Sequence, residues 1–241
     1  MKVHFPVKKG VFSRTCGYVK AVDDVSFAIR RGDILGVVGE SGCGKSTMAR
    51  AIMGLVKPTA GSVLLDDSVS MVFQDPLGSL NPRMTVRSAI EEILANARRK
   101  VGGSEVTSPL ELLSLVGLDA SALDKYPHEF SGGQRQRICI ARAIAARPKL
   151  LICDEAVSAL DLSIRSQILG LLRQLRRKLD LSMMFITHDL GVVQHLADEI
   201  IVMRHGKITE EGSCEQVLKT PRDEYTRYLI SSVPKIGKAL T

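Results

Sequence analysis

Residues 39–47 read GESGCGKST and follow the apolar run ILGVV at residues 34–38. From Gly39 to Ser46 this stretch matches the pattern G-x-x-x-x-G-K-[ST], and a helical pattern begins directly after it. Glycines at these positions let backbone N–H groups converge on phosphate oxygens, because no Cβ stands in the way. The order of buried strand, glycine loop and helix therefore predicts a phosphate-binding loop.

The polar residues of this loop predict that its ligand is a nucleoside triphosphate with a metal ion. Lys45 can reach the terminal phosphates, and the Ser46 hydroxyl can ligate Mg²⁺. Cys43 is either a reactive thiol or a small filler residue, and the sequence favours neither. The predicted binding residues of the loop are Gly39, Glu40, Ser41, Gly42, Cys43, Gly44, Lys45, Ser46 and Thr47.

A second motif, KLLICDE at residues 149–155, is a continuous apolar strand that ends on two acids. Asp154 lies where the strand leaves the core and suits a Mg²⁺ ligand. Glu155 follows it and suits a general base that activates water. Two such acids could also be only a polar end to the strand. Behind a phosphate-binding loop, however, they predict hydrolysis of the triphosphate.

Composition places the chain among globular proteins that do not bind nucleic acid. Of its 241 residues, 45% are hydrophobic and 24% are charged. Aromatic residues make up 4% with no Trp, which leaves little material for stacking on bases. The net charge of +7 is concentrated at the N-terminus. The basic residues there either form a solvated face or attract nucleotide phosphates or an anionic membrane surface. These N-terminal basic residues are Lys2, Lys8, Lys9, Arg14 and Lys20.

The cysteines and the hydropathy pattern predict a protein of a reducing compartment. The cysteines are odd in number and show no metal-ligand spacing, so we expect free thiols, no disulfide and no zinc. The N-terminus lacks the apolar segment of a signal peptide, and no apolar run approaches the roughly 20 residues of a spanning helix. We therefore expect a cytoplasmic chain. The five cysteines are Cys16, Cys43, Cys139, Cys153 and Cys214.

Strands alternate with helices along the chain, which predicts an α/β fold with a mainly parallel sheet in one domain, residues 1–241. Ser108 to Glu111 form a capping box with Pro109 at the first helical position. Residues 85–117 read as a helical insert, and Gly206 marks a hairpin turn. The expected strands are 33–38, 62–66, 68–73, 149–153, 182–187 and a hairpin over 199–212. The expected helices are 47–56, 85–100, 132–147 and one with a helical apolar period from Ile164 to Leu179.

The stretch FSGGQRQR at residues 130–137 resembles the signature of the ATP-binding cassette (ABC) ATPases. The resemblance implies the P-loop NTPase fold, with a small antiparallel β subdomain, a helical subdomain at about 78–145 and a tail at about 220–241. It also implies that ATP and Mg²⁺ are the cofactors. In this family the signature helix meets a γ-phosphate held by the partner subunit, a role that falls here on Ser131, Gly132, Gly133 and Gln134.

The remaining family motifs also have counterparts in this sequence. Gln74 in VFQDP resembles the Q-loop glutamine, which contacts Mg²⁺ and the attacking water. SALD at residues 158–161 resembles the D-loop, so Asp161 is expected at the nucleotide. His188 in FITHD resembles the switch histidine that holds the γ-phosphate and orients the general base. For the aromatic residue that stacks on adenine, Phe5 is the choice, with Phe12 and Tyr18 as rivals.

Finer features, including EYTRYLISSVP at residues 224–234, resemble the dipeptide and oligopeptide importer ATPases, a group that includes nickel importers. The N-terminal segment 5–22 is more similar to the second ATPase of such operons. The resemblance implies a peripheral subunit on the cytoplasmic face of the plasma membrane, a sister ATPase, two transmembrane permeases and an extracytoplasmic solute-binding protein. Two other readings stay open: a binding-only subunit paired with an active sister, and a soluble ABC ATPase without a permease.

The sequence departs from the family at two places. Only residues 68–70 separate GSVLLDD from MVFQDP, where the family carries a further strand and a basic helical stretch. Three residues span about 10 Å, so we expect a shortened antiparallel subdomain, either through true loss or through a missing piece of sequence. Ala156 stands where the family has Pro, which frees φ, restores an N–H and predicts a looser turn after Glu155.

Overall fold

A computed structural model describes residues 1–9, 14–65, 68–101 and 108–232 of the chain. The chain divides into two compact units. Unit 1 comprises Met1–Ala28, Ile34–Val63 and Phe185–Thr241, and unit 2 comprises Ile29–Asp33 and Leu64–Met184. Strand β6 (Ser182–Ile186) carries the chain from unit 2 into unit 1.

Unit 1 contains a sheet segment in which β3 (Ile34–Val38) pairs in parallel with β7 (Glu199–Arg204). Every residue of β3 is buried, as expected for an apolar strand covered on both faces. Strand β7 then pairs antiparallel with β8 (Lys207–Ser213). The two residues between them, His205 and Gly206, have φ of 48° and 78°, the pair of positive angles typical of a tight hairpin turn. The predicted turn at Gly206 is confirmed.

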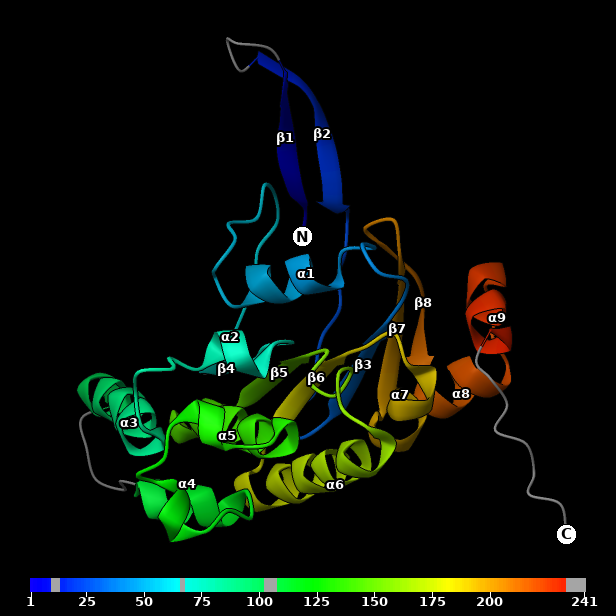
Figure 1. The fold of residues 1–241 in the computed structure, drawn as a ribbon. Helices are drawn as coiled ribbons and strands as arrows, with labels where there is room; N and C mark the ends of the chain where they lie inside the picture. The colour runs from blue at the N-terminus through cyan, green and yellow to red at the C-terminus, as the bar shows by residue number, and fades with distance from the viewer. Residues whose placement is uncertain (10–13, 66–67, 102–107, 233–241) are drawn as a thin grey trace, which may run out of the picture. The chain divides into compact units, whose positions relative to one another are not determined.

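The described residues of unit 1 form the helices α1 (Lys45–Ile52), α7 (Leu190–Leu196), α8 (Cys214–Lys219) and α9 (Glu224–Ser231). Figure 1 shows α8 and α9 following β8 at the end of the described chain. Side chains of β3, β7 and the last three helices form one apolar cluster, which includes Val38, Val193, Val202, Val217 and Tyr225. The helix predicted to run to residue 56 ends earlier, because Gly54 adopts a left-handed φ of 73° that terminates α1.

Unit 1 also carries an antiparallel hairpin of β1 (Val3–Lys9) and β2 (Arg14–Val22), which confirms a small antiparallel element (Figure 1). The strand predicted at residues 62–66 is wrong for 62–65, the part that the structure describes, and residue 66 lies outside the described residues. In this region a single bridge joins Lys2 to Ala60. Strand β4 already begins at Val69, so the chain is too short to add a third strand and return.

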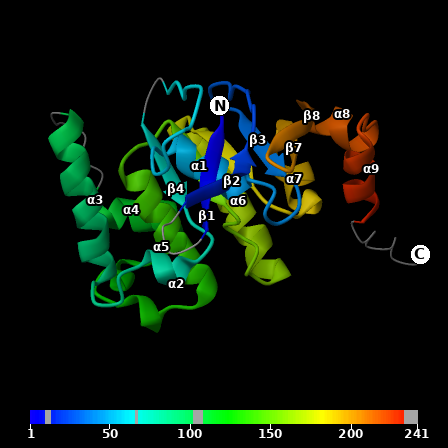
Figure 2. The same cartoon turned by 90° about the horizontal axis from the view of Figure 1, so that it is seen from above.

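In unit 2, β4 (Val69–Val72) pairs in parallel with β5 (Leu150–Asp154). Its helices are α2 (Pro76–Ser79), α3 (Val86–Val101), α4 (Pro109–Leu115), α5 (Gly132–Ala145) and α6 (Leu162–Leu179). Two short 3-10 helices, Ala120–Ala122 and Pro127–Glu129, join α4 to α5. Helix α5 packs against α2, α3, α4 and α6, and Figure 2 shows α2, α3 and α4 gathered around it.

Local sequence signals explain where the helices of unit 2 begin. The capping box predicted at Ser108 is present, with Pro109 in the first turn of α4. Asp161 caps α6 by accepting a hydrogen bond from the backbone N–H of Ile164. The parallel strand pairs with flanking helices confirm the predicted α/β class. The subdomain limits at about 78–145 and 220–241 stay predictions, and residues 102–107 and 233–241 within them lie outside the described residues.

Candidate functional site

The glycine loop leads from β3 into α1, as the sequence predicts. Gly44 precedes the first turn of α1 with a φ of 112°, a left-handed angle that favours glycine. A Cβ at this position would collide with the carbonyl oxygen of Ala21. Gly44 has no side chain that could cap the helix, and no side-chain hydrogen bond caps the start of α1. The backbone N–H groups of a first helical turn point out of the end of the helix, toward any ligand bound there. This geometry suits an anionic ligand.

Lys45 lies inside the loop, with only 4% of the residue exposed. Its Nζ donates hydrogen bonds to the carbonyl oxygens of Gly39, at 2.7 Å, and Glu40, at 2.8 Å. These bonds compensate for the burial of the ammonium group. The Sγ of Cys43 is 3.7 Å from the same nitrogen. The positive charge is therefore held within the loop that is predicted to bind phosphate.

The outer side of the loop is braced by other parts of unit 1. Gly206 in the β7–β8 turn donates its N–H to the carbonyl of Cys43 at 2.8 Å. Tyr225 of α9 accepts a hydrogen bond from the backbone N–H of Glu40 on its hydroxyl, at 3.1 Å. Sequence reasoning missed Tyr225, although it lies in the segment EYTRYLISSVP that carried the resemblance to the importer ATPases. The backbone of the loop is thus held by hydrogen bonds to two residues that are far away in the sequence.

Gln74 and Glu155 meet in unit 2, although 81 positions separate them. The Nε2 of Gln74 donates to the Oε2 of Glu155 at 3.2 Å. Asp154 ends β5 and is buried, whereas Glu155 begins the following turn with a φ of 48°. A left-handed angle at a non-glycine residue costs roughly 1–2 kcal/mol and is common where function fixes the backbone. Gln74 and Glu155 therefore lie close together because they follow the neighbouring parallel strands β4 and β5.

The turn after Glu155 is tied by hydrogen bonds of the backbone and of a serine. Both the N–H and the hydroxyl of Ser158 donate to the carbonyl of Glu155, at 3.1 and 2.9 Å. Ala156, which replaces the proline of the family pattern, lies within this turn and is buried. The looser turn expected from Ala156 stays a prediction.

The signature motif opens helix α5 with a complete capping box. The Ser131 hydroxyl accepts from Gln134 N at 3.3 Å, and the Gln134 side chain accepts from Ser131 N at 3.0 Å. Gly132 is exposed, whereas Gly133 is buried. A Cβ on Gly133 would lie 2.6 Å from Cγ2 of Ile164 in α6. The start of α5 therefore packs against α6, the helix that is capped by Asp161, the predicted D-loop residue.

His188 and the predicted adenine-stacking residues lie in unit 1. His188 is exposed on the segment between β6 and α7, directly before Asp189, which caps α7. Phe5 on β1 is 41% exposed, and Tyr18 on β2 is 63% exposed. Phe5 pairs with Val19 rather than with Tyr18, so the two aromatic rings lie on opposite faces of the hairpin. Phe12 lies outside the described residues.

The predicted site residues thus divide between the two units. Unit 1 holds the glycine loop, His188 and Phe5, and unit 2 holds Gln74 and the acids after β5 together with the signature and D-loop residues. All five cysteines are free thiols, as predicted. Burial raises the pKa of the Cys139 and Cys153 thiols to about 12, and for Cys153 the neighbouring Asp154 adds to the effect.

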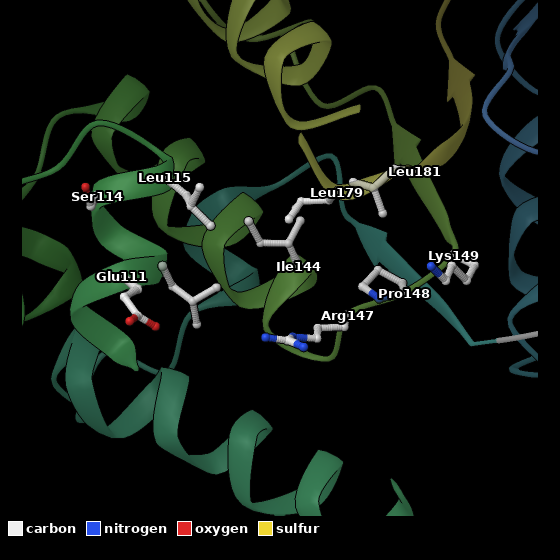
Figure 3. Close-up of a pocket in the computed structure, with 10 residues that line it drawn as sticks. Glu111, Ser114, Leu115, Ile144, Arg147, Pro148, Lys149, Leu179 and Leu181 are labelled. Carbon is white, nitrogen blue, oxygen red and sulfur yellow. The ribbon is translucent and has the colours of Figure 1, made fainter. Parts of the chain in front are cut away.

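A cavity of about 580 Å³ lies within unit 2, at the end of α5 that leads into β5 (Figure 3). Its wall is mostly aliphatic, and the carboxylate of Glu111 there accepts the N–H of Ser108 in the capping box of α4. None of the predicted site residues lines it. The lining residues are Glu111, Leu112, Ser114, Leu115, Ile144, Arg147, Pro148, Lys149, Leu179 and Leu181.

Within the described residues, no helix combines the length and the apolar character needed to cross a bilayer. Comparison with protein families matches residues 22–158 to the ABC transporter family. The oligopeptide transport ATP-binding protein OppF of Escherichia coli is 48% identical over 253 residues, which cover 97% of this chain and 76% of OppF. The dipeptide transport ATP-binding protein DppF of Haemophilus influenzae is 43% identical, over 100% of this chain and 78% of DppF.

Among solved structures, a dimer of the ATP-binding cassette MJ0796 in a post-hydrolysis state, bound to ADP and Pi, has a TM-score of 0.72 and 28% identity. The match covers 88% of this chain and 96% of the other. The alignment with OppF is longer than the 241 residues of this chain, so OppF has residues that this chain lacks. By sequence and by fold, this chain belongs to the ATP-binding subunits of the ABC transporter family.

Proposed function

We propose that this chain hydrolyses ATP to power the transport of dipeptides, oligopeptides or related small solutes across a membrane. The observation that carries the proposal is the glycine loop, where the buried Lys45 lies at the start of a helix that no side chain caps. The cargo class is inferred from the names of the relatives, which are oligopeptide and dipeptide transport ATP-binding proteins.

The loop residues 39–47 are proposed to bind the phosphates of ATP, with Lys45 exchanging its carbonyl partners for phosphate oxygens. Mg²⁺ would be held by the Ser46 hydroxyl, the Asp154 carboxylate and the side-chain oxygen of Gln74. These are the oxygen ligands that Mg²⁺ prefers, and the Gln74 nitrogen already faces Glu155. When bound, the metal ion would neutralise charge on the phosphates.

Glu155 is proposed as the general base that takes a proton from the attacking water. Gln74 restrains its carboxylate through the hydrogen bond of 3.2 Å. His188 is proposed to hold the γ-phosphate and to orient Glu155. Phe5, exposed on β1, is proposed to stack on the adenine ring.

Two ATPase subunits are proposed to close head to tail on two ATP molecules. In this arrangement Ser131, Gly132, Gly133, Gln134 and Asp161 of one subunit would complete the site on the other. Support comes from the dimeric cassette with ADP and Pi, which shares this fold. The proposed partners are a sister ATPase and two permeases at the cytoplasmic face of the plasma membrane, with an extracytoplasmic solute-binding protein delivering cargo.

A binding-only subunit is the second candidate, favoured by the short link of residues 68–70 before Gln74, where the family pattern has a further strand and a helical stretch. ATP hydrolysis should be measured with the purified chain, alone and with the sister ATPase encoded beside it. Hydrolysis that Glu155→Gln abolishes supports the proposed function. ATP binding without hydrolysis in either sample indicates the binding-only subunit. An active chain that never co-purifies with membranes or permeases would instead be a soluble ATPase.

A further inference from the structure

One peptide unit of the phosphate loop, between Gly39 and Glu40, is hydrogen-bonded at both ends. Its carbonyl oxygen, on Gly39, accepts from Lys45 Nζ at 2.7 Å. Its N–H, on Glu40, donates to the hydroxyl of Tyr225 at 3.1 Å. In a trans peptide these two groups point in opposite directions. Lys45 and Tyr225 therefore hold the same plane from its two sides.

Tyr225 is itself held firmly in place. Only 5% of the residue is exposed, and its ring packs in the apolar cluster with Val38 at the end of β3. The guanidinium of Arg204 lies 4.6 Å from the ring centre, at cation–π distance. Burial raises the pKa of the Tyr225 hydroxyl above its ordinary value of 10, so the group stays neutral at physiological pH.

Helix α9, which carries Tyr225, is anchored to β8 through the two residues that precede it. The carboxylate of Glu210 on β8 accepts the N–H groups of Arg222, at 2.8 Å, and Asp223, at 3.1 Å. Asp223 in turn caps α9 by accepting the N–H of Tyr225 at 2.9 Å. The position of the phenol is thus set by the sheet and not only by the helix.

We propose that Tyr225 is a positioning residue for ATP binding, which acts by orienting the Gly39–Glu40 peptide and through it the ammonium group of Lys45. This inference rests on the proposed function and adds to it a role for helix α9. A bonded N–H also polarises its own peptide, which strengthens the carbonyl that receives Lys45. Without the phenol hydroxyl, the Gly39–Glu40 peptide can rotate, and its carbonyl no longer holds the Lys45 ammonium group in one position.

The test compares Tyr225→Phe with Tyr228→Phe in the full chain. The first variant keeps the ring in its cluster and beneath Arg204 but removes the hydroxyl. The second removes a hydroxyl from the same helix at a residue that is 61% exposed. A hydrogen bond of ordinary strength corresponds to about a fivefold effect, so we expect Tyr225→Phe to weaken binding of ATP with Mg²⁺ about fivefold. Tyr228→Phe should bind ATP as the unmodified protein does.

A second measurement, hydrogen exchange at the Glu40 amide without nucleotide, does not depend on ATP binding. Tyr225→Phe should speed exchange there, whereas Tyr228→Phe should leave it unchanged. Equal ATP affinity and equal exchange in the two variants would overturn the proposal. A lower melting temperature with unchanged ATP affinity would overturn it too, because Tyr225 would then be structural only. If the unmodified protein fails to bind ATP while the amide result holds, the proposed function fails and the orienting contact survives.

Discussion

The amide of Gln74 donates a hydrogen bond to the carboxylate of Glu155 over 3.2 Å, joining the residues that follow two neighbouring parallel strands. This bond leaves the amide oxygen of Gln74 available to a metal ion while its nitrogen restrains the acid. One side chain can therefore link the metal ligand set to the proposed base. The hydrogen bond restrains the orientation of the Glu155 carboxylate.

Replacing Glu155 by Gln should abolish turnover and preserve ATP binding. The amide keeps the size of the side chain and can still bond to Gln74, but it cannot accept a proton from water. General-base catalysis contributes about 10²–10⁴-fold, so we expect the hydrolysis rate to fall by at least about 100-fold. Steady-state ATPase rates and ATP titrations measure the two properties separately. Retained hydrolysis would exclude Glu155 as the base.

The contact between Gly133 and Ile164 predicts a rescue experiment. Gly133→Ala should destabilise the protein by about 1–3 kcal/mol, because the new Cβ would stand 2.6 Å from Cγ2 of Ile164. Ile164→Ala removes that carbon. In the double variant, Gly133→Ala should therefore destabilise the protein less than it does when Ile164 is present. Denaturant unfolding of the unmodified protein, the two single variants and the double variant measures their free energies of unfolding.

Gly132→Ala is the matched control, because the nearest atom to its Cβ would be a carbon of Leu160 at 4.0 Å. It should not lower stability, since alanine favours helix more than glycine does. If Gly132→Ala nevertheless stops hydrolysis, the glycine faces the ligand. Additive effects of Gly133→Ala and Ile164→Ala would contradict the packing explanation.

The carboxylate of Glu210 predicts a loss of stability in acid. Burial alone would raise its pKa, but the hydrogen bonds from Arg222 N and Asp223 N outweigh burial and hold the pKa below its ordinary value of 4.5. A lowered folded pKa means that the stabilisation is present above about pH 4.5 and is lost as the pH falls through the folded value. Glu210→Gln should therefore be less stable than the unmodified protein near neutral pH, with the difference shrinking in acid.

Melting curves between neutral pH and acid, recorded for both proteins, test this dependence. Glu211→Gln, an exposed neighbour on the same strand, serves as the control. A stability difference for Glu210→Gln that stays constant down to acid would show that the charge of this carboxylate does not stabilise the fold.

The thiols should differ in reactivity with iodoacetamide. Since burial raises the pKa of Cys139 and Cys153 to about 12, about one in 10⁴ of these groups is a thiolate at pH 8. Cys16 is exposed, so we expect mass spectrometry of the native protein to find alkylation there and none at the other two. The denatured protein, in which all five cysteines should react, is the control. Alkylation of native Cys153 would mean that β5 opens readily.

Local chemistry explains what the sequence could predict. The glycine loop, the capping box at Ser108 and the turn at Gly206 each depend on a few adjacent residues, and the structure places them as expected. The strand predicted at residues 62–66 is wrong over 62–65, because local propensity favours a strand there, whereas little chain remains before β4 begins at Val69. The bond from Glu40 to Tyr225 spans 185 positions, and no local pattern specifies such a contact.

The hairpin of β1 and β2 bears on how this protein behaves at high concentration. A sheet of two strands presents unpaired backbone groups along its outer sides, where another molecule could add a strand. Pro6 in β1 lacks the N–H that such pairing needs, and Lys8 places a charged, exposed side chain on the same strand. We therefore expect these residues to disfavour strand addition, so replacing them with apolar residues should increase aggregation at high protein concentration, measured by light scattering.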